Sequence, residues 1–123
     1  MTGNDVLIWL GMFSLPVCLL ILGGLLSNNP PREINCHWGH RTRTSMQSQE
    51  AWDLAQQLSG HNMVSFGVAA ALFTVAMAVA REFAGLSIEM TLGVALTVNS
   101  ILGVASAVLT EQQLKRRLKE REK

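Results

Sequence analysis

The sequence predicts an all-α integral membrane protein that forms one membrane domain over residues 1–123. Three stretches contain no Asp, Glu, Lys, Arg or His: Val6 to Leu26, Val64 to Ala80 and Met90 to Leu109. They are 21, 17 and 20 residues long. About 20 helical residues cross a hydrocarbon core roughly 30 Å thick. Because lipid cannot hydrogen-bond to an exposed backbone, each stretch is expected to be a transmembrane helix.

The positions of the basic residues predict the orientation in the membrane. Lys and Arg accumulate on the cytoplasmic side. The segment before the first span has none; Arg32, Arg41 and Arg43 lie in the first loop, Arg81 lies in the second, and Lys115, Arg116, Arg117, Lys119, Arg121 and Lys123 lie in the tail. Grouping the first loop with the tail gives nine basic residues against one on the other side. This predicts an outside N-terminus and a cytoplasmic C-terminus.

The first span, residues 6–26, is expected to stay in the mature protein and to bend at Pro16. Proline removes a backbone donor and kinks a helix. A cleaved signal peptide begins with a basic region and has a shorter apolar core, whereas this segment carries Asp5 and no basic residue before its long apolar run. Cys18 lies in this span and Cys36 in a loop predicted to be cytoplasmic, so we expect both to be free thiols.

A short amphipathic helix is predicted between the first two spans. Apolar residues recur at helical spacing from Ser48 to Ser59, namely Ala51, Trp52, Leu54, Ala55 and Leu58. Ser45 or Ser48 can cap its start, and Gly60 is expected to stop it. At about three turns it is too short to span, so we expect it at the membrane interface, with Trp52 at headgroup level. Loop and helix together occupy residues 27–62.

The second and third spans, residues 64–80 and 90–109, are expected to form an antiparallel hairpin. Both contain small residues that let helices approach closely: Gly67, Ala71, Thr74 and Ala78 on one, and Gly93, Thr97, Gly103 and Ala107 on the other. Asn99 lies near the middle of the third span and is interpreted as an interhelical hydrogen-bond donor. Residues 110–123 are predicted to continue as a basic cytoplasmic helix that anchors the topology.

The segment from Ile34 to Ser45, followed by Glu50-Ala51-Trp52, resembles the signature of the SdpI family of small bacterial membrane proteins. We call residues 34–45 the motif loop. In that family Asn, Gly and Arg-Thr precede a Ser or Thr, and a Trp follows on a short helix between two spans. The matching positions are Asn35, Gly39, Arg41, Thr42, Ser45, Glu50, Trp52, Ala55 and Gly60.

The resemblance implies a location in the bacterial cytoplasmic membrane and a role without chemistry. The family's best-known role is immunity to a secreted, membrane-active peptide toxin, with an associated signalling role. The chain departs from the pattern at His40, where members usually carry an apolar residue, and at Arg43, where they often carry Pro. Many members also have additional N-terminal spans.

The residues themselves give the motif loop a physical interpretation. Asn35 and Gly39 suit turns, and Thr42 and Ser45 can cap a following helix. Arg41 offers a planar fork of five donors for phosphate, carboxylate or backbone carbonyls. The candidate binding residues are Asn35, Gly39, Arg41, Thr42, Ser45, Glu50 and Trp52. An alternative is that the loop only docks the short helix on the bundle.

Other classes of site find little support in the sequence. Cys36, His37, His40 and His61 lack the spacing of a structural zinc site. No nucleophile with a base, paired carboxylates or phosphate-binding glycine loop is present, so neither an enzyme nor a cofactor is expected. The spans carry no ionisable groups of the kind that channels and transporters use. A net charge of +1 gives no indication of a nucleic-acid partner.

We therefore expect a multi-pass membrane protein that confers immunity to, or senses, a membrane-active peptide toxin or envelope stress by non-covalent binding. Its partners would be the lipid bilayer and a peptide toxin or membrane protein, and formation of a homo-oligomer stays open. The alternative is a small structural or assembly subunit of a larger inner-membrane complex.

Overall fold

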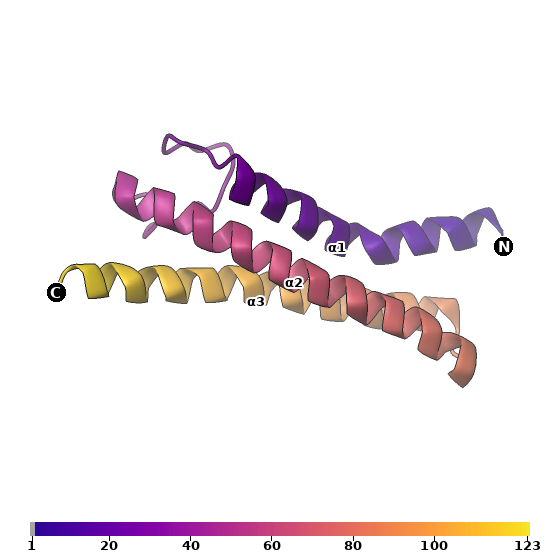
Figure 1. Ribbon diagram of the computed structural model, residues 1–123. Coiled ribbons are helices and arrows are strands. Elements are labelled where there is room, and N and C mark those ends of the chain that lie inside the picture. Colours follow the sequence, from indigo (N-terminus) through magenta and orange to yellow (C-terminus); the bar gives the residue numbers. More distant parts are fainter. Residues whose placement is uncertain (1) are drawn as a thin grey trace.

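The computed structural model describes residues 2–123 and contains three long helices within that range (Figure 1). These are α1 (Gly3–Asn28), α2 (Gln49–Ala84) and α3 (Ile88–Arg121). Each contains one of the predicted spans, and each is long and apolar enough to cross a membrane. The all-helical fold with three membrane-spanning helices is confirmed.

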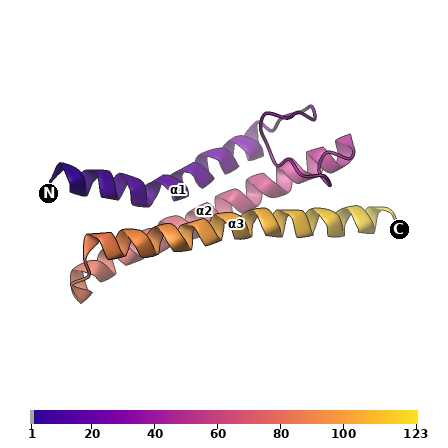
Figure 2. The ribbon, with the colours of Figure 1, turned by 180° about the vertical axis from the view of Figure 1, so that it is seen from behind.

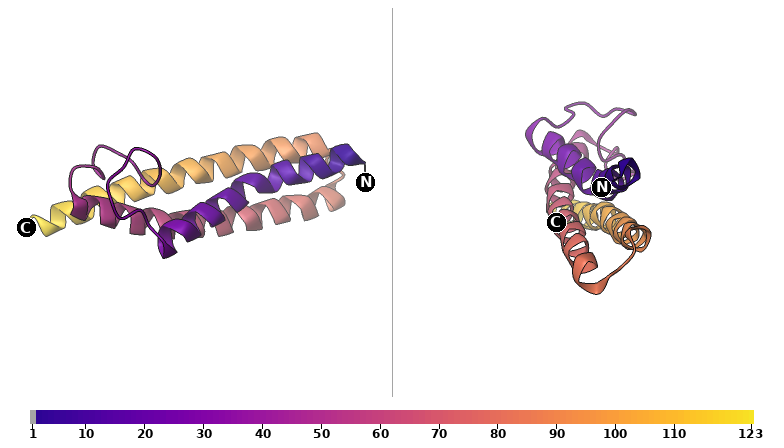
Figure 3. Two further views of the ribbon diagram at one scale, coloured as in Figure 1. Left: turned by 90° about the horizontal axis from the view of Figure 1, so that it is seen from above. Right: turned by 90° about the vertical axis from the view of Figure 1, so that its right-hand side faces the viewer.

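The helices lie roughly side by side, and the two ends of the bundle differ. Helices α2 and α3 form an antiparallel hairpin, and α1 packs against both of them (Figures 1 and 2). The chain between α1 and α2 lies at the same end as the C-terminus, whereas the N-terminus lies at the end of the α2–α3 turn (Figure 3, left). Seen end-on, the three helices are arranged as a triangle (Figure 3, right).

Local sequence signals set the ends of the helices. The side chain of Ser48 accepts a hydrogen bond of 3.1 Å from the Ala51 amide and caps α2, which resolves the choice between Ser45 and Ser48. Ser87 caps α3 in the same way. Gly85 ends α2 in the left-handed conformation, with φ of 66°, which glycine adopts without steric cost.

The prediction of a separate interfacial helix is wrong. Residues 49–59 form the first turns of the continuous helix α2, and Gly60 lies inside this helix. The apolar face of this segment packs against the distal part of α3, where Leu114 is fully buried and Leu118 lies against the same cluster. The two segments outside the predicted spans each carry one apolar face, so they bury those faces against each other instead of in lipid.

Trp52 is therefore not a headgroup anchor. Its side chain is fully buried, and its indole N–H donates a 2.7 Å hydrogen bond to the carbonyl of Pro31. A buried indole needs such an acceptor. The residue fixes the chain that leaves α1 onto α2.

Close backbone contact explains why glycine stands at position 60. A Cβ added there would lie 2.8 Å from the backbone nitrogen of Ser27 and 3.1 Å from the carbonyl oxygen of Gly23. Gly23 faces α2 just as tightly, since its own Cβ would lie 2.7 Å from the Val64 nitrogen. Small residues at this crossing let α1 and α2 approach, which supplies packing where lipid offers no hydrophobic driving force.

Pro16 and Asn99 both act on the backbone carbonyl of Met12. Proline at position 16 has no N–H for the oxygen of Met12, four residues earlier, and α1 bends near its middle (Figure 1). The side-chain amide of fully buried Asn99 donates to this oxygen at 3.4 Å and to the Thr74 hydroxyl at 2.9 Å. The kink and the interhelical role of Asn99 are both confirmed, and Asn99 joins all three helices.

The buried face of α3 is not the stripe of small residues noted in the sequence. Gly93 and Gly103 have open space where a Cβ would be. The buried positions are instead Thr91, Ala95, Asn99, Ser106, Thr110 and Leu114. Most of these side chains are small or carry a hydroxyl group. Helix α3 continues as one helix beyond the predicted span, to Arg121.

The glycine contact gives a paired prediction. Replacing Gly60 by Ala is expected to destabilise the fold by about 1 to 3 kcal/mol because the methyl group meets the backbone of α1. Gly103→Ala enters open space and should leave stability unchanged or raise it through helix propensity. Unfolding in mixed detergent micelles, followed by circular dichroism, measures both. Equal stability of the two variants would contradict the close contact.

Candidate functional site

The motif loop begins with a turn built by one side chain. The side-chain oxygen of Asn35 accepts hydrogen bonds from the backbone amides of His37 and Trp38, at 2.9 and 3.0 Å. Gly39 follows with φ of 105°, a conformation that favours glycine. A Cβ there would also lie 2.7 Å from the side-chain oxygen of Gln56. The predicted turn roles of Asn35 and Gly39 are confirmed.

A second turn closes the motif loop. The amide of Thr42 donates to the Ser45 hydroxyl oxygen at 2.8 Å, and the amide of Ser45 donates to the Thr42 hydroxyl oxygen at 3.1 Å. The buried hydroxyl of Ser45 in turn donates to the carbonyl of His40 at 2.9 Å. These two side chains satisfy the loop backbone rather than cap α2.

Gln56 of α2 holds the middle of the loop. Its side-chain oxygen accepts a 2.8 Å hydrogen bond from the His40 amide, and its side-chain nitrogen donates to the His40 carbonyl at 3.1 Å. Gln56 is fully buried, and it follows Trp52 by one helical turn, so both side chains lie on the same face of α2. The segment that connects α1 to α2 packs against this face of α2.

Glu111 of α3 holds the loop from the other side. One of its carboxylate oxygens accepts a 2.8 Å hydrogen bond from the Thr42 hydroxyl and lies 3.1 Å from Nε2 of His40. Burial alone would raise the pKa of Glu111, but hydrogen bonds from Thr44, His40 and Thr42 outweigh it and hold the pKa below its ordinary value. The loop is thus joined to α3 through an ionised carboxylate.

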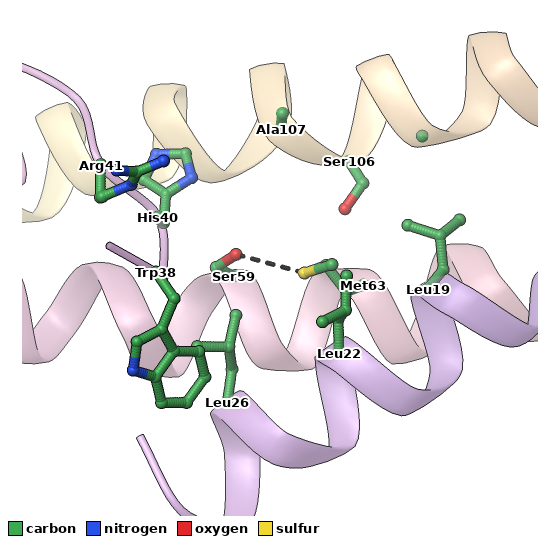
Figure 4. Close-up of a pocket in the computed structure, with 12 residues that line it drawn as sticks. Leu19, Leu22, Leu26, Trp38, His40, Arg41, Ser59, Met63, Ser106 and Ala107 are labelled. Carbon is green, nitrogen blue, oxygen red and sulfur yellow. Dashed lines mark hydrogen bonds between the residues drawn. The ribbon is translucent and has the colours of Figure 1, made fainter. Parts of the chain in front are cut away.

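A cavity of about 340 Å³, the loop pocket, lies beneath the motif loop and between the three helices. Residues 38–41 form its roof (Figure 4). Below them the walls are made by Leu19, Leu22 and Leu26 of α1, Ser59 and Met63 of α2, and Ser106 of α3. The Arg41 guanidinium lies at the polar end and donates to the Cys36 carbonyl, so part of its predicted clamp is already engaged.

The structure gathers most, but not all, of the predicted binding residues. Asn35, Gly39, Arg41, Thr42 and Ser45 lie together in the motif loop, whereas Trp52 is buried below it. Glu50 lies apart, exposed near the start of α2, where its carboxylate pairs with Arg121.

Sequence reasoning missed His40, Gln56, Glu111 and Ser106. Gln56 is not among the apolar residues that define the predicted helix face, although its spacing of four from Trp52 places both side chains on one face. Glu111 was the only acid at the start of a basic tail, which gave a weak signal. No pattern pointed to Ser106.

Within residues 2–123, no group of three His, Cys, Asp or Glu side chains is arranged to hold a metal ion. Cys18 and Cys36 are free thiols, as expected from the sequence.

A model of the SdpI/YfhL protein family matches residues 32–110, a segment that runs from the motif loop through α2 and most of α3. The chain belongs to this family. It is also similar to the uncharacterized protein YfhL of Bacillus subtilis (strain 168), with 38% identity over 50 residues. That alignment covers 41% of this chain and 46% of the relative, so the chain matches less than half the length of this curated protein. No solved structure matches the chain.

The family match covers the residues that build the site and leaves α1 outside. Each side chain that fixes the motif loop, from Asn35 to Glu111, lies within the matched range or next to its end. Helix α1 nevertheless supplies the leucine wall of the loop pocket.

Removing the side chain of Gln56 should release the motif loop. Gln56→Ala leaves the part-buried amide of His40 without a partner, at a cost of about 1 to 3 kcal/mol, and leaves its carbonyl with the Ser45 hydroxyl alone. Gln57→Ala changes the exposed neighbour and serves as the control. Trypsin cleavage after Arg41 and Arg43 in micelles measures the release. Similar cleavage rates for the two variants would contradict the role of Gln56.

Acid should weaken the attachment of the loop to α3. Because the folded-state pKa of Glu111 lies below the ordinary glutamate value of 4.5, the ionised carboxylate stabilises the fold above that pH. This contribution disappears as the pH falls through the folded-state pKa. Glu111→Gln should therefore lose less stability than the wild type on acidification, whereas the exposed Glu120→Gln should follow the wild type. Thermal unfolding measured at several pH values tests this, and parallel curves for all three proteins would refute it.

Proposed function

We propose that this chain protects a bacterial cell from a membrane-active peptide, or senses such a peptide or the envelope stress it causes, by non-covalent binding at the motif loop. The observation that carries the proposal is the firmly attached motif loop above the loop pocket, in a chain of the SdpI/YfhL family. The resemblance of this loop to the SdpI signature supports the protective role.

The geometry of the site favours binding over catalysis. The Ser59 hydroxyl donates to the sulfur of Met63, and the Ser106 hydroxyl has no partner within residues 2–123. Neither serine of the loop pocket is therefore paired with a base in that range. His40 is the histidine of the loop pocket, and its ring contacts Glu111. Trp38, 40% exposed, and Arg41 present an aromatic ring and a guanidinium at the surface, a combination that suits recognition.

We also propose that the motif loop faces the cytoplasm. The loop and the C-terminus lie at the same end of the bundle (Figure 3), and this end carries nine of the ten basic residues. A peptide that acts from outside would then meet this site after it has entered the membrane, and the motif loop would meet soluble signalling partners directly.

A survival assay tests the protective role. Cells that are sensitive to the membrane-active peptide countered by SdpI-family proteins should survive it when they express only this chain. Arg41→Ala should abolish survival, because the exposed guanidinium is the cationic group of the loop pocket. Arg43→Ala removes an exposed arginine that does not line the pocket and should keep survival intact.

Membrane levels of all variants must be equal for this comparison. Killing of cells that express the wild-type chain at such levels would contradict the protective role, and full survival with Arg41→Ala would refute the part assigned to Arg41. Recovery of the chain in fixed proportion with other membrane proteins, together with no survival, would favour a structural or assembly subunit.

A further inference from the structure

We infer that the loop pocket is a binding site for a glycerophospholipid from the leaflet on the side of the motif loop. The phosphate lies at Arg41, an ester carbonyl lies at Ser106, and an acyl chain follows the leucine wall of α1. This inference uses the same pocket and the same Arg41 as the proposed function, but it does not require that the chain protects cells.

An unpartnered hydroxyl inside the pocket points to a ligand. Ser106 is only 2% exposed, and its hydroxyl oxygen has no hydrogen-bond partner within the described residues. The side chain lies in the pocket, between α3 and Met63 (Figure 4). A buried hydroxyl without a partner is costly, and a ligand that offers an acceptor at this depth removes the cost.

The positively charged side chain of Arg41 lies at the other end of the same pocket. Arg41 is exposed, and in residues 2–123 its one hydrogen-bond acceptor is the carbonyl of Cys36. The remaining donors of its fork suit the oxygens of a phosphate. Glu111, the nearby acid, does not line the pocket. Its carboxylate contacts Thr42 and His40, and one of its oxygens lies 3.8 Å from Nζ of Lys115.

The order of these groups along the bundle matches the order of groups in a phospholipid. The roof of the pocket is attached to α3 at Glu111, five residues beyond Ser106, which places the two levels roughly 7.5 Å apart along the helix axis. The cation therefore lies nearer the end of the bundle, and the hydroxyl lies deeper. In a phospholipid the phosphate likewise lies outside the ester groups, which are followed by the chains.

The wall of the pocket formed by α1 is apolar. Leu19, Leu22 and Leu26 follow one another at helical spacing along α1, and Leu22 is 46% exposed, so the wall continues onto the lipid-facing surface. An acyl chain can enter sideways from the bilayer and lie along this wall. A volume of about 340 Å³ is enough for the glycerol region and part of one chain, while the rest stays in the membrane.

A phospholipid fits the polar groups of this pocket better than a peptide does. A peptide brings an N–H and a C=O with every residue, and each needs a partner when it is buried. Below the roof the pocket offers two hydroxyls, and that of Ser59 already donates to Met63. A lipid with one phosphate and one buried ester needs only Arg41 and Ser106.

Three probe lipids test the assignment with purified protein in detergent: a diacyl phosphatidylglycerol, its dialkyl ether analogue, which lacks the ester carbonyls, and diacylglycerol, which lacks the phosphate. Native mass spectrometry reports the bound fraction. We expect the diacyl phospholipid to bind best. Arg41→Gln should weaken its binding about tenfold, the effect of losing a hydrogen bond to a charged group, whereas Arg43→Gln should bind as the wild type does.

Ser106→Ala provides a second readout. It should weaken binding of the diacyl lipid a few-fold and abolish the preference for ester over ether, whereas Ser100→Ala, an exposed serine on the same helix, should preserve that preference. Circular dichroism confirms that each variant is folded. A large excess of inorganic phosphate should not displace the lipid, because the chain contributes to binding.

Equal binding of phosphatidylglycerol and diacylglycerol, or equal losses in Arg41→Gln and Arg43→Gln, would overturn the inference. So would an ester preference that survives Ser106→Ala, or a pocket that binds a membrane-active peptide and none of the lipids. These assays contain no living cells, so failure of lipid binding and failure of protection are separate results.

Discussion

This structure depends on hydrogen bonds to the backbone that connects α1 to α2, where the chain leaves one membrane helix and enters the next. Residues 29–48 form no helix, so their amides and carbonyls require partners from elsewhere. Side chains of α2 provide several of them: Trp52 donates to the Pro31 carbonyl, Gln49 donates to the Arg32 carbonyl, and Gln56 binds both polar groups of the His40 backbone. Glu111 of α3 holds the loop through the Thr42 hydroxyl. The motif loop is in this sense a polar layer built onto the end of the helical bundle.

This layer explains why α2 and α3 continue beyond the predicted spans. Trp52 and Gln56 lie in the first turns of α2, and Glu111 lies past the end of the third apolar stretch. These extensions are stabilised by burial of Leu54 and Leu58 against Leu114. The loop pocket follows from the same arrangement, because the polar roof spans the space between α1 and α3 without filling it.

The sequence was sufficient for the features that depend on composition and local signals. The length of the apolar stretches predicted the three spans, and Pro16 predicted the kink. The sequence offered Ser45 or Ser48 as the cap, and the structure places it at Ser48. The sequence was insufficient for features that depend on contacts between segments far apart along the chain. The amphipathic face around Trp52 fitted a membrane interface as well as a protein partner, and only the matching face of Leu114 decides between them. Gln56 and Glu111 could not be recognised as loop ligands, because side chains 16 and 69 residues away from their partners meet only in the fold.

Amide hydrogen exchange of the wild-type protein in lipid nanodiscs tests most directly whether the motif loop is a fixed layer. The amides of His37, Trp38, His40, Thr42 and Ser45 all donate hydrogen bonds to side chains. The account predicts slow exchange at these five positions, with His40 as protected as amides within the adjoining turns of α2. Exchange at the rate of an unstructured peptide across the loop, while α2 stays protected, would contradict it.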